Sequence, residues 1–228
     1  MDNDGLFIIA GNNNFVPTKT LIDTNNNNFK RNEIHRNIFT SEELLELYQA
    51  INNAKESDTK ITSIYCQKIW FTDLPQNIKN KVTEVMTKIH NRPVKLEEIS
   101  FARYSKEYGD FPSLTPHYDN HVKYPRVTLD VQLNSNMAWP IIVESKAMVL
   151  KNNEAATFSG THQIHWRSPI VFKDNDFIEM LFCHFSLPGS NQITIDELRD
   201  IDKQLMYHTN RFAMRLMIEN EKLKVKTT

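Results

Sequence analysis

The sequence predicts a mostly β protein with flanking α-helices, in which the strands form a sandwich or a closed structure. Between about residues 96 and 187, short runs rich in β-branched and aromatic residues follow one another, separated by turn residues. Two amphipathic helical patterns precede this region and a third follows it. Consecutive short strands without intervening helices favour antiparallel sheets that pack face to face or close on themselves.

The length and composition predict one domain over residues 1–228. The chain has 228 residues, of which 40% are hydrophobic, enough for one sizeable core. The formal net charge is −1, without the basic excess typical of nucleic-acid-binding proteins, which argues against a nucleic-acid partner. No apolar run approaches the roughly 20 residues needed to span a bilayer, so we expect no membrane association and a soluble, cytoplasmic protein. Cys66 and Cys183 lie in apolar runs and are expected to be buried free thiols.

Residues 1–38 form an asparagine-rich arm, with clusters at 12–14 and 25–28. Asparagine competes with regular backbone hydrogen bonding and favours turns. We therefore expect an irregular segment with one or two short strands, which is also a candidate lid over a site.

Residues 39–95 are expected to support the β region. Thr40 and Glu43 have the spacing of a capping box, and an apolar stripe follows them at helical spacing. A strand-like run covers residues 61–71, and a second helical pattern covers about 76–90. Both helices are interpreted as elements that pack on the core.

Residues 96–187 contain the β-rich core. The expected strands are 99–105, 126–134, 141–144, 147–151, 155–158 and 177–186. Residues 106–116 form a polar and aromatic loop that leads toward the first ligand candidates and is a second candidate lid.

Residues 188–228 begin with a break at Leu187-Pro188-Gly189, which ends the strand pattern. A long amphipathic helical pattern then starts at Thr194, with Glu197 at capping-box spacing. We expect this C-terminal helix to pack on the core or to pair with a second subunit as a homodimer.

The most informative residues for function are two histidines and an aspartate. His117 and Asp119 are two residues apart, so on a strand their side chains point to the same side. His165 lies in a later strand-like segment and can join them. Two imidazoles and one carboxylate on one side of a metal are typical of the facial triad of non-haem Fe(II) oxygenases.

Two neighbouring histidines are alternative ligands. His121 shares a strand face with Asp119, but on a regular strand it lies about 13 Å from His117, too far for both to bind one ion. His162 points away from His165 if the segment is extended. The pair of His117 with Asp119, completed by His165, is the preferred set.

Several segments occur in one order that resembles a known family: Phe101–Tyr104, His117-x-Asp119, Arg126–Asn134, Trp139–Ile141 and His165–Arg167. Together they resemble the core of the Fe(II)- and 2-oxoglutarate-dependent dioxygenases, in the prolyl-hydroxylase-like branch. The resemblance implies a double-stranded β-helix, a cupin-like jelly roll, braced by the N-terminal helices. It also implies hydroxylation of a C–H bond, with 2-oxoglutarate converted to succinate and CO2. Retention of Asp119 is consistent with hydroxylation, because related halogenases lack this carboxylate.

The resemblance further implies residues that bind 2-oxoglutarate. The far carboxylate of the cosubstrate needs a cation, ideally a bidentate arginine. Arg167 shares a face with His165 and is the first candidate, and Lys173 is the second. Tyr104 matches a tyrosine that often binds the cosubstrate. Gln132 shares one face of its strand with Thr128 and is a candidate residue for lining the cosubstrate pocket.

The expected substrate is a peptide or a small molecule. Arg126 is a candidate for the mouth of the site, and Trp139 is a second candidate, although packing is its preferred role. Two other functions use the same residues: a zinc-dependent hydrolase and a non-catalytic jelly-roll binding module. The hydrolase is weakened because no His-Glu-x-x-His motif supplies a general base.

Overall fold

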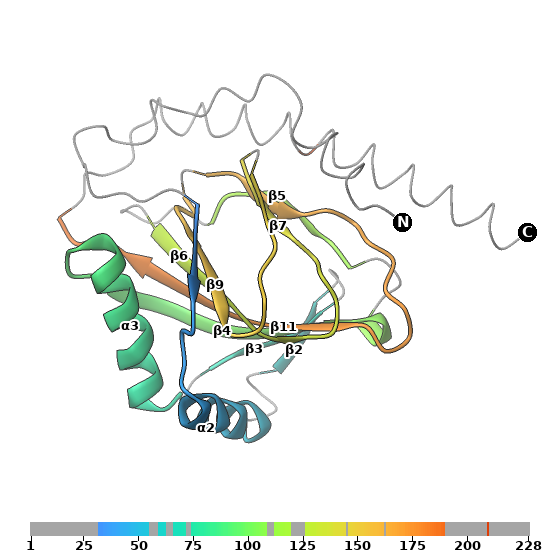
Figure 1. Ribbon diagram of the computed structural model, residues 1–228, viewed down its shortest axis with the longest axis horizontal. Helices are drawn as coiled ribbons and strands as arrows, with labels where there is room; N and C mark the ends of the chain where they lie inside the picture. The colour runs from blue at the N-terminus through green and yellow to red at the C-terminus, as the bar shows by residue number, and fades with distance from the viewer. Residues whose placement is uncertain are drawn as a thin grey trace, which may run out of the picture.

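The computed structural model describes residues 32–54, 59–62, 66–71, 74–108, 112–119, 126–144, 146–161 and 163–189, together with Thr209. Within these ranges the chain forms one seven-stranded sheet and one four-stranded sheet, with two α-helices beside them (Figure 1). The strands are paired antiparallel throughout both sheets. The predicted mostly β fold class is confirmed.

The larger sheet contains most of the buried strands. In spatial order its strands are β1 (Glu33–Arg36), β9 (Glu154–Phe158), β6 (Arg126–Ser135), β11 (Phe177–Ser186), β4 (Lys95–Ser105), β3 (Cys66–Trp70) and β2 (Thr59–Thr62). Since β6 and β11 are central and buried along most of their length, side chains on their two faces meet different surroundings.

The smaller sheet carries the segments with the ligand candidates. Its strands, in spatial order, are β5 (Leu114–His117), β10 (His165–Arg167), β7 (Ile141–Val143) and β8 (Lys146–Met148). The chain passes repeatedly between the two sheets, because β5, β7, β8 and β10 alternate in sequence with β6, β9 and β11. This arrangement is that of a jelly roll.

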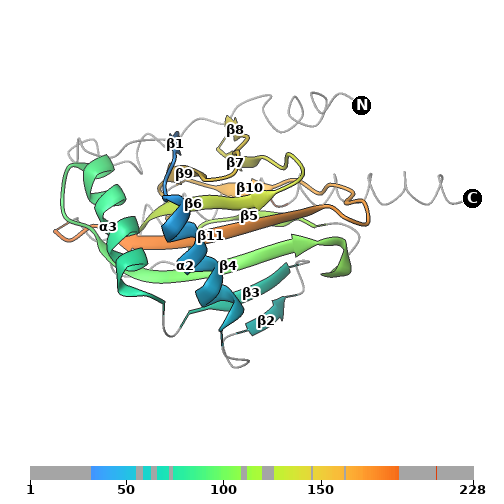
Figure 2. The ribbon, with the colours of Figure 1, turned by 60° about the horizontal axis from the view of Figure 1, so that its bottom comes forward.

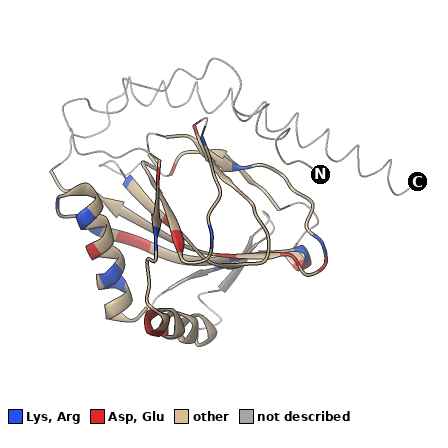
Figure 3. Ribbon diagram, viewed as in Figure 1, with Lys and Arg blue, Asp and Glu red and all other residues tan. Residues whose placement is uncertain are grey.

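Both predicted helices are present. Helix α2 (Ser41–Asn52) begins after Thr40, whose hydroxyl accepts from the amide of Glu43 while the Glu43 side chain accepts from the Thr40 amide, as the capping box requires. Helix α3 (Gln76–His90) ends at Asn91, which has a left-handed conformation. Charged residues recur along α3 (Figure 3), and Glu84 and Lys88 are exposed.

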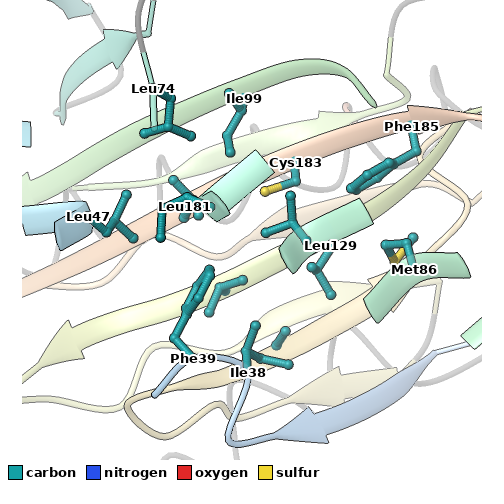
Figure 4. Close-up of a cluster of buried hydrophobic side chains, with 14 of the residues drawn as sticks. Ile38, Phe39, Leu47, Leu74, Met86, Ile99, Leu129, Leu181, Cys183 and Phe185 are labelled. Carbon is teal, nitrogen blue, oxygen red and sulfur yellow. The ribbon is translucent and has the colours of Figure 1, made fainter. Parts of the chain in front are cut away.

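The helices cover one face of the larger sheet and form the first hydrophobic core (Figures 2 and 4). Leu47 of α2 and Met86 of α3 pack with residues from alternate positions of the central strands, including Leu129, Leu181 and Phe185. This packing leaves the opposite face of the same strands free to face the smaller sheet.

The second hydrophobic core lies on that opposite face. It contains residues of both sheets, among them Tyr104, Trp139, Val143, Phe158 and Met180. The two cysteines divide between the cores: Cys183 belongs to the first and Cys66 to the second, and both are buried and in no disulfide, as predicted.

Two strand predictions need correction. The single strand expected over residues 61–71 is a hairpin, because β2 and β3 pair with each other and only β3 continues onto β4. The loop expected over residues 106–116 contains a 3-10 turn, η2 (Lys106–Tyr108), and then β5, which pairs with β10. The first error merged two strands that are adjacent in the sequence, and the second comes from β10, a pairing partner that is distant in the sequence.

Other predictions fall partly or wholly outside the described residues. Strand β1 lies in the predicted N-terminal arm, of which residues 1–31 do not belong to the described part. The long C-terminal helix falls almost entirely on residues outside it, so this helix and the domain boundaries stay predictions. No helix within the described ranges combines the length and apolar character of a transmembrane span.

Candidate metal centre

The three predicted ligands converge at one end of the smaller sheet. His117 ends β5 and His165 begins β10, and the two residues are direct partners in the antiparallel pairing. Asp119 lies two residues beyond the end of β5, so the strand alternation predicted for it does not apply, yet its carboxylate reaches the same point. One potential ligand atom from each of the three residues lies within 4.8 Å of the others.

The imidazole nitrogens of both histidines are oriented for metal binding. Nδ1 of His117 lies 2.7 Å from the carbonyl oxygen of Thr115, and Nδ1 of His165 lies 3.0 Å from that of Gln163. A carbonyl oxygen can only accept, so each Nδ1 carries a proton, and Nε2 of the neutral ring presents its lone pair. These Nε2 atoms lie 3.9 Å and 3.5 Å from Asp119 Oδ1. Such carbonyl contacts are typical of metal-binding histidines, since they fix the tautomer and the ring orientation.

Asp119 is held by its own backbone and by β6. Its amide donates a 2.8 Å hydrogen bond to the carbonyl of Gly160, and the hydroxyl of Thr128 donates to Oδ2 at 2.9 Å. The carboxylate is only 8% exposed. Because Oδ2 is engaged, Oδ1 is directed at the two imidazoles.

The electrostatics favour the protonation states that a metal needs at Asp119 and His117. Burial lowers the pKa of His117 to about 4, and the neighbouring His165 adds to the effect. Burial alone would raise the pKa of Asp119, but the imidazoles of His165, His184 and His117 outweigh it and hold this pKa well below its usual range. At neutral pH the site therefore presents a carboxylate and a neutral His117 ring. At His165, burial lowers the pKa but the Asp119 carboxylate outweighs it and raises this pKa, so a metal displaces a proton from His165.

A third imidazole beside Asp119 was missed by the sequence analysis. His184 of β11 places Nε2 3.8 Å from Asp119 Oδ2 and Nδ1 3.9 Å from Glu98 Oε1. His184 thus faces Oδ2, the outer oxygen of the carboxylate, whereas His117 and His165 face Oδ1, the inner one. Strand alternation in β11 indicates that His184 faces inward. Its pairing with Thr128, which contacts Asp119, is what places it near the site, and this pairing is not visible in the sequence.

Arg167 lies in the interior between the sheets, where a charged group is unusual. Its side chain is 1% exposed, and its guanidinium donates to the carbonyl of Trp139 and, at 3.5 Å, to Met180 Sδ. The guanidinium also lies 5.0 Å from the ring centroid of Trp139. Its Nε has no hydrogen-bond partner among the described residues. A buried guanidinium with an unpaired N–H fits the far carboxylate of a dicarboxylate ligand.

Tyr104 lies next to Arg167. Its ring meets that of Trp139 at 5.0 Å in an edge-to-face arrangement, and burial raises the pKa of its hydroxyl far above the ordinary value. The phenol therefore stays neutral and can donate a hydrogen bond. Of the four predicted cosubstrate residues, Tyr104 and Arg167 are the two that the fold brings together.

The other two cosubstrate candidates occupy different surroundings. Lys173 is exposed, and its backbone amide binds the Asp176 carboxylate at 2.7 Å. Gln132 is buried, but its amide nitrogen donates to the carbonyl of Leu150 at 3.0 Å and to Ser135 Oγ at 3.1 Å. These contacts favour a structural role for Gln132, which joins the end of β6 to the segment that precedes β9.

The substrate candidates differ in the same way. Trp139 is 3% exposed and donates from Nε1 to the carbonyl of Ser168 at 2.8 Å, which supports its preferred packing role. Arg126 is half-buried at the start of β6, and its Nε has no partner in the described part of the chain. The alternative ligands His121 and His162 lie outside the described residues.

Comparison with known proteins identifies the fold. No family model matches the sequence, and neither does any curated protein. Solved structures do match. A viral collagen prolyl hydroxylase from Paramecium bursaria Chlorella virus-1, in complex with 2-oxoglutarate, superposes with a TM-score of 0.50 at 14% identity, over 69% of this chain and 97% of the viral one. The fold is that of the 2-oxoglutarate- and Fe(II)-dependent oxygenases.

Two further solved structures match over most of the chain. An oxidoreductase of the 2OG-Fe(II) oxygenase family from Burkholderia pseudomallei gives a TM-score of 0.53 at 12% identity, over 70% of this chain and 86% of that one. HygX from Streptomyces hygroscopicus, with nickel and 2-oxoglutarate bound, gives 0.52 at 9% identity, over 85% and 90%. The resemblance found in the sequence is thus matched by the oxygenase fold.

Proposed function

We propose that this protein is an Fe(II)- and 2-oxoglutarate-dependent dioxygenase. The observation that carries the proposal is the facial arrangement of His117, Asp119 and His165, with both Nε2 atoms turned toward Asp119 Oδ1. Two imidazoles and one carboxylate suit non-haem Fe(II) and leave coordination positions for a cosubstrate and dioxygen. The solved structures that share this fold include 2OG-Fe(II) oxygenases, which supports the assignment.

The residues present fit both the metal and 2-oxoglutarate. His117, Asp119 and His165 would hold the metal, and Arg167 with Tyr104 would hold the far carboxylate of 2-oxoglutarate in the interior between the sheets. When bound, iron and 2-oxoglutarate supply the oxidative chemistry, in which 2-oxoglutarate, O2 and a C–H substrate give succinate, CO2 and the hydroxylated product.

The chain contributes geometry and a dry surrounding. The Thr115 and Gln163 carbonyls fix the two imidazoles, and Thr128 fixes the outer oxygen of Asp119. A cluster of buried apolar residues lines the interior near Arg167, which keeps water away and strengthens the interaction with a carboxylate.

The two alternative functions lack a comparable observation. A zinc hydrolase with these ligands needs a carboxylate base next to the metal-bound water. A binding module needs no buried guanidinium between its sheets. Arg167, 1% exposed and with an unpaired Nε among the described residues, favours an enzyme that binds a dicarboxylate cosubstrate.

The substrate is proposed to be a peptide or a small molecule. Prolyl hydroxylases among the solved structures with this fold make proline-containing peptides a reasonable first group for a screen. Arg126, at the start of β6, is proposed to contact the substrate, since it is half-buried with an unpaired Nε among the described residues. The single domain, the cytoplasmic location and a homodimer through residues 188–228 stay predictions.

The test uses purified protein stripped of metal and reloaded with Fe(II) or Zn(II). With Fe(II), 2-oxoglutarate and O2, we expect slow succinate formation that a correct substrate accelerates. With Zn(II), we expect none. Hydrolysis of an ester or amide by the Zn(II) protein, without succinate formation by the Fe(II) protein, would replace the dioxygenase assignment with the hydrolase.

A further inference from the structure

Asp130 is a buried acid on the inner face of β6 that the proposed function leaves without a role. It is 3% exposed and pairs across the sheet with Phe182 of β11 and Ala156 of β9. Its Oδ1 has no hydrogen-bond partner in the described part of the chain. A buried carboxyl oxygen without a hydrogen bond is costly, so its presence calls for a partner that arrives with a ligand.

The strand register puts Asp130 between the two ends of the proposed cosubstrate site. On the inner face of β6, Thr128 precedes it and contacts the metal ligand Asp119. On β11, Phe182 is the cross-strand partner of Asp130. The next inward residue of β11 toward its start is Met180, whose sulfur accepts a hydrogen bond from Arg167. Successive inward positions on a strand are about 7 Å apart. A 2-oxoglutarate molecule that reaches from the triad to Arg167 therefore passes Asp130.

The formal charges of the loaded site restrict the state of Asp130. The two positive charges of the metal and the one of Arg167 balance the single charge of Asp119 and the two of 2-oxoglutarate. An ionised Asp130 would add a buried negative charge without compensation. Lys68 is the other cation whose charge acts on Asp130, but it is half-buried, and its ammonium lies 5.6 Å from the centroid of the Phe182 ring.

Burial also favours the neutral form of this acid. It raises the pKa of Asp130 to about 7, against the opposing effects of His165 and Arg167. The protonated form of Asp130 is therefore populated at neutral pH, and in this form a carboxylic acid is a hydrogen-bond donor as well as an acceptor.

We propose that Asp130 is a further residue of the 2-oxoglutarate site, where its neutral carboxylic acid donates a hydrogen bond to a carboxylate of the cosubstrate. The inference rests on the proposed function, since it assumes that 2-oxoglutarate binds between the triad and Arg167. Asp130 would then act together with Arg167 and select for an anionic, carboxylate-bearing ligand along this path.

The test measures binding of 2-oxoglutarate to the full-length, Ni(II)-loaded protein by isothermal titration calorimetry, which needs no turnover. Asp130→Asn keeps an N–H donor and should retain the dissociation constant within about threefold, whereas Asp130→Leu and Asp130→Val remove the donor and should weaken binding by roughly 10- to 100-fold. The two apolar variants differ in size, so a folding defect in one leaves the other to decide.

Three results would overturn the inference. Apolar variants that bind as tightly as the wild type would remove any role for Asp130. An Asp130→Asn protein as weak as the apolar variants would exclude the donor role. An Asp130→Asn protein that binds more than about tenfold tighter would show that the native carboxylate is ionised and repels the cosubstrate.

Controls separate this failure from failure of the proposed function. Ni(II) affinity and melting temperature, measured for each variant, report an intact triad and fold. Val131→Ala alters the neighbouring residue on the helix-covered face and should lower stability without changing 2-oxoglutarate affinity. If the wild type itself does not bind 2-oxoglutarate, the dioxygenase assignment fails. If it binds and Arg167→Leu weakens binding while the Asp130 variants do not, only the Asp130 inference fails.

Discussion

Gly160 and Asp119 approach each other so closely that the ligand carboxylate occupies the space of a side chain on Gly160. A Cβ atom at this glycine would lie 1.6 Å from Asp119 Oδ2 and 2.7 Å from Thr128 Oγ1. The carbonyl of Gly160 also accepts the 2.8 Å hydrogen bond from the Asp119 amide. Gly160 thus lets two backbone segments meet where the carboxylate must be directed at the imidazoles.

We therefore expect Gly160→Ala to impair metal binding. The methyl group displaces the Asp119 carboxylate from Thr128, and loss of such supporting contacts lowers metal affinity by about 10- to 100-fold. Equilibrium dialysis with Mn(II) or Ni(II) measures the effect.

Gly189→Ala is the matched control for this prediction. Gly189 has a φ of +78°, and a methyl group at this position would lie 3.8 Å from the nearest non-neighbouring atom, Nη2 of Arg92. Alanine there should cost about 1 kcal/mol of stability through backbone strain and leave metal affinity unchanged. Unchanged metal affinity in Gly160→Ala would contradict the proposed positioning of Asp119.

Arg167→Leu should weaken 2-oxoglutarate binding by roughly 100-fold, because a buried, charge-assisted bidentate pair is worth a few kcal/mol. Arg167→Lys should recover only part of the affinity, since an ammonium cannot reproduce the planar fork. Calorimetric titration of the Ni(II)-loaded variants gives the dissociation constants.

Lys173→Leu serves as the comparison, because Lys173 is exposed and its replacement should leave the dissociation constant within about twofold of the wild type. A strong effect of Lys173→Leu together with a weak effect of Arg167→Leu would move the carboxylate anchor to the lysine.

Asn153→Ala should destabilise the fold without touching the site. Asn153 has a φ of 63°, accepts from the Phe39 amide at 2.9 Å and donates to the Phe39 carbonyl at 2.7 Å. It therefore ties the segment before α2 to the turn before β9. Loss of two hydrogen bonds and of a residue tolerant of the left-handed region should lower the free energy of unfolding by about 2–3 kcal/mol.

Denaturant titration of the apo protein measures this change. The metal affinity of the Asn153→Ala protein, determined below its melting temperature, should equal that of the wild type. A stability within about 0.5 kcal/mol of the wild type would show that these hydrogen bonds contribute little.

The sequence was sufficient for the elements whose signals are local. The capping box at Thr40 and the periodic apolar positions from residue 76 predicted α2 and α3, and the alternation in 126–134 and 177–186 predicted the central strands. Long-range pairing was not readable in the same way. Strand β10 is three residues long and pairs with β5 and β7, so its bounds and its partners were not readable although His165 lay in a strand-like segment.

In the candidate site too, the local signals were readable from the sequence and the long-range contacts were not. The His-x-Asp spacing pointed to His117 and Asp119, although Asp119 lies beyond the strand and is oriented by Gly160 and Thr128. His184 and Asp130 were missed because strand alternation tells which residues face inward, and only the register tells which of these face the metal. Asp130 did leave a signal, a charged residue in the middle of a buried strand.

His117, Asp119 and His165 are proposed to hold iron for 2-oxoglutarate chemistry. The most direct measurement is release of labelled CO2 from 1-carboxyl-labelled 2-oxoglutarate by Fe(II)-loaded protein in the presence of O2. We expect release by the wild type, and a fall to background for Asp119→Ala and His165→Ala proteins that keep their melting temperature without metal. Absence of release by the wild type across a broad substrate panel, or undiminished release by either folded variant, would contradict it.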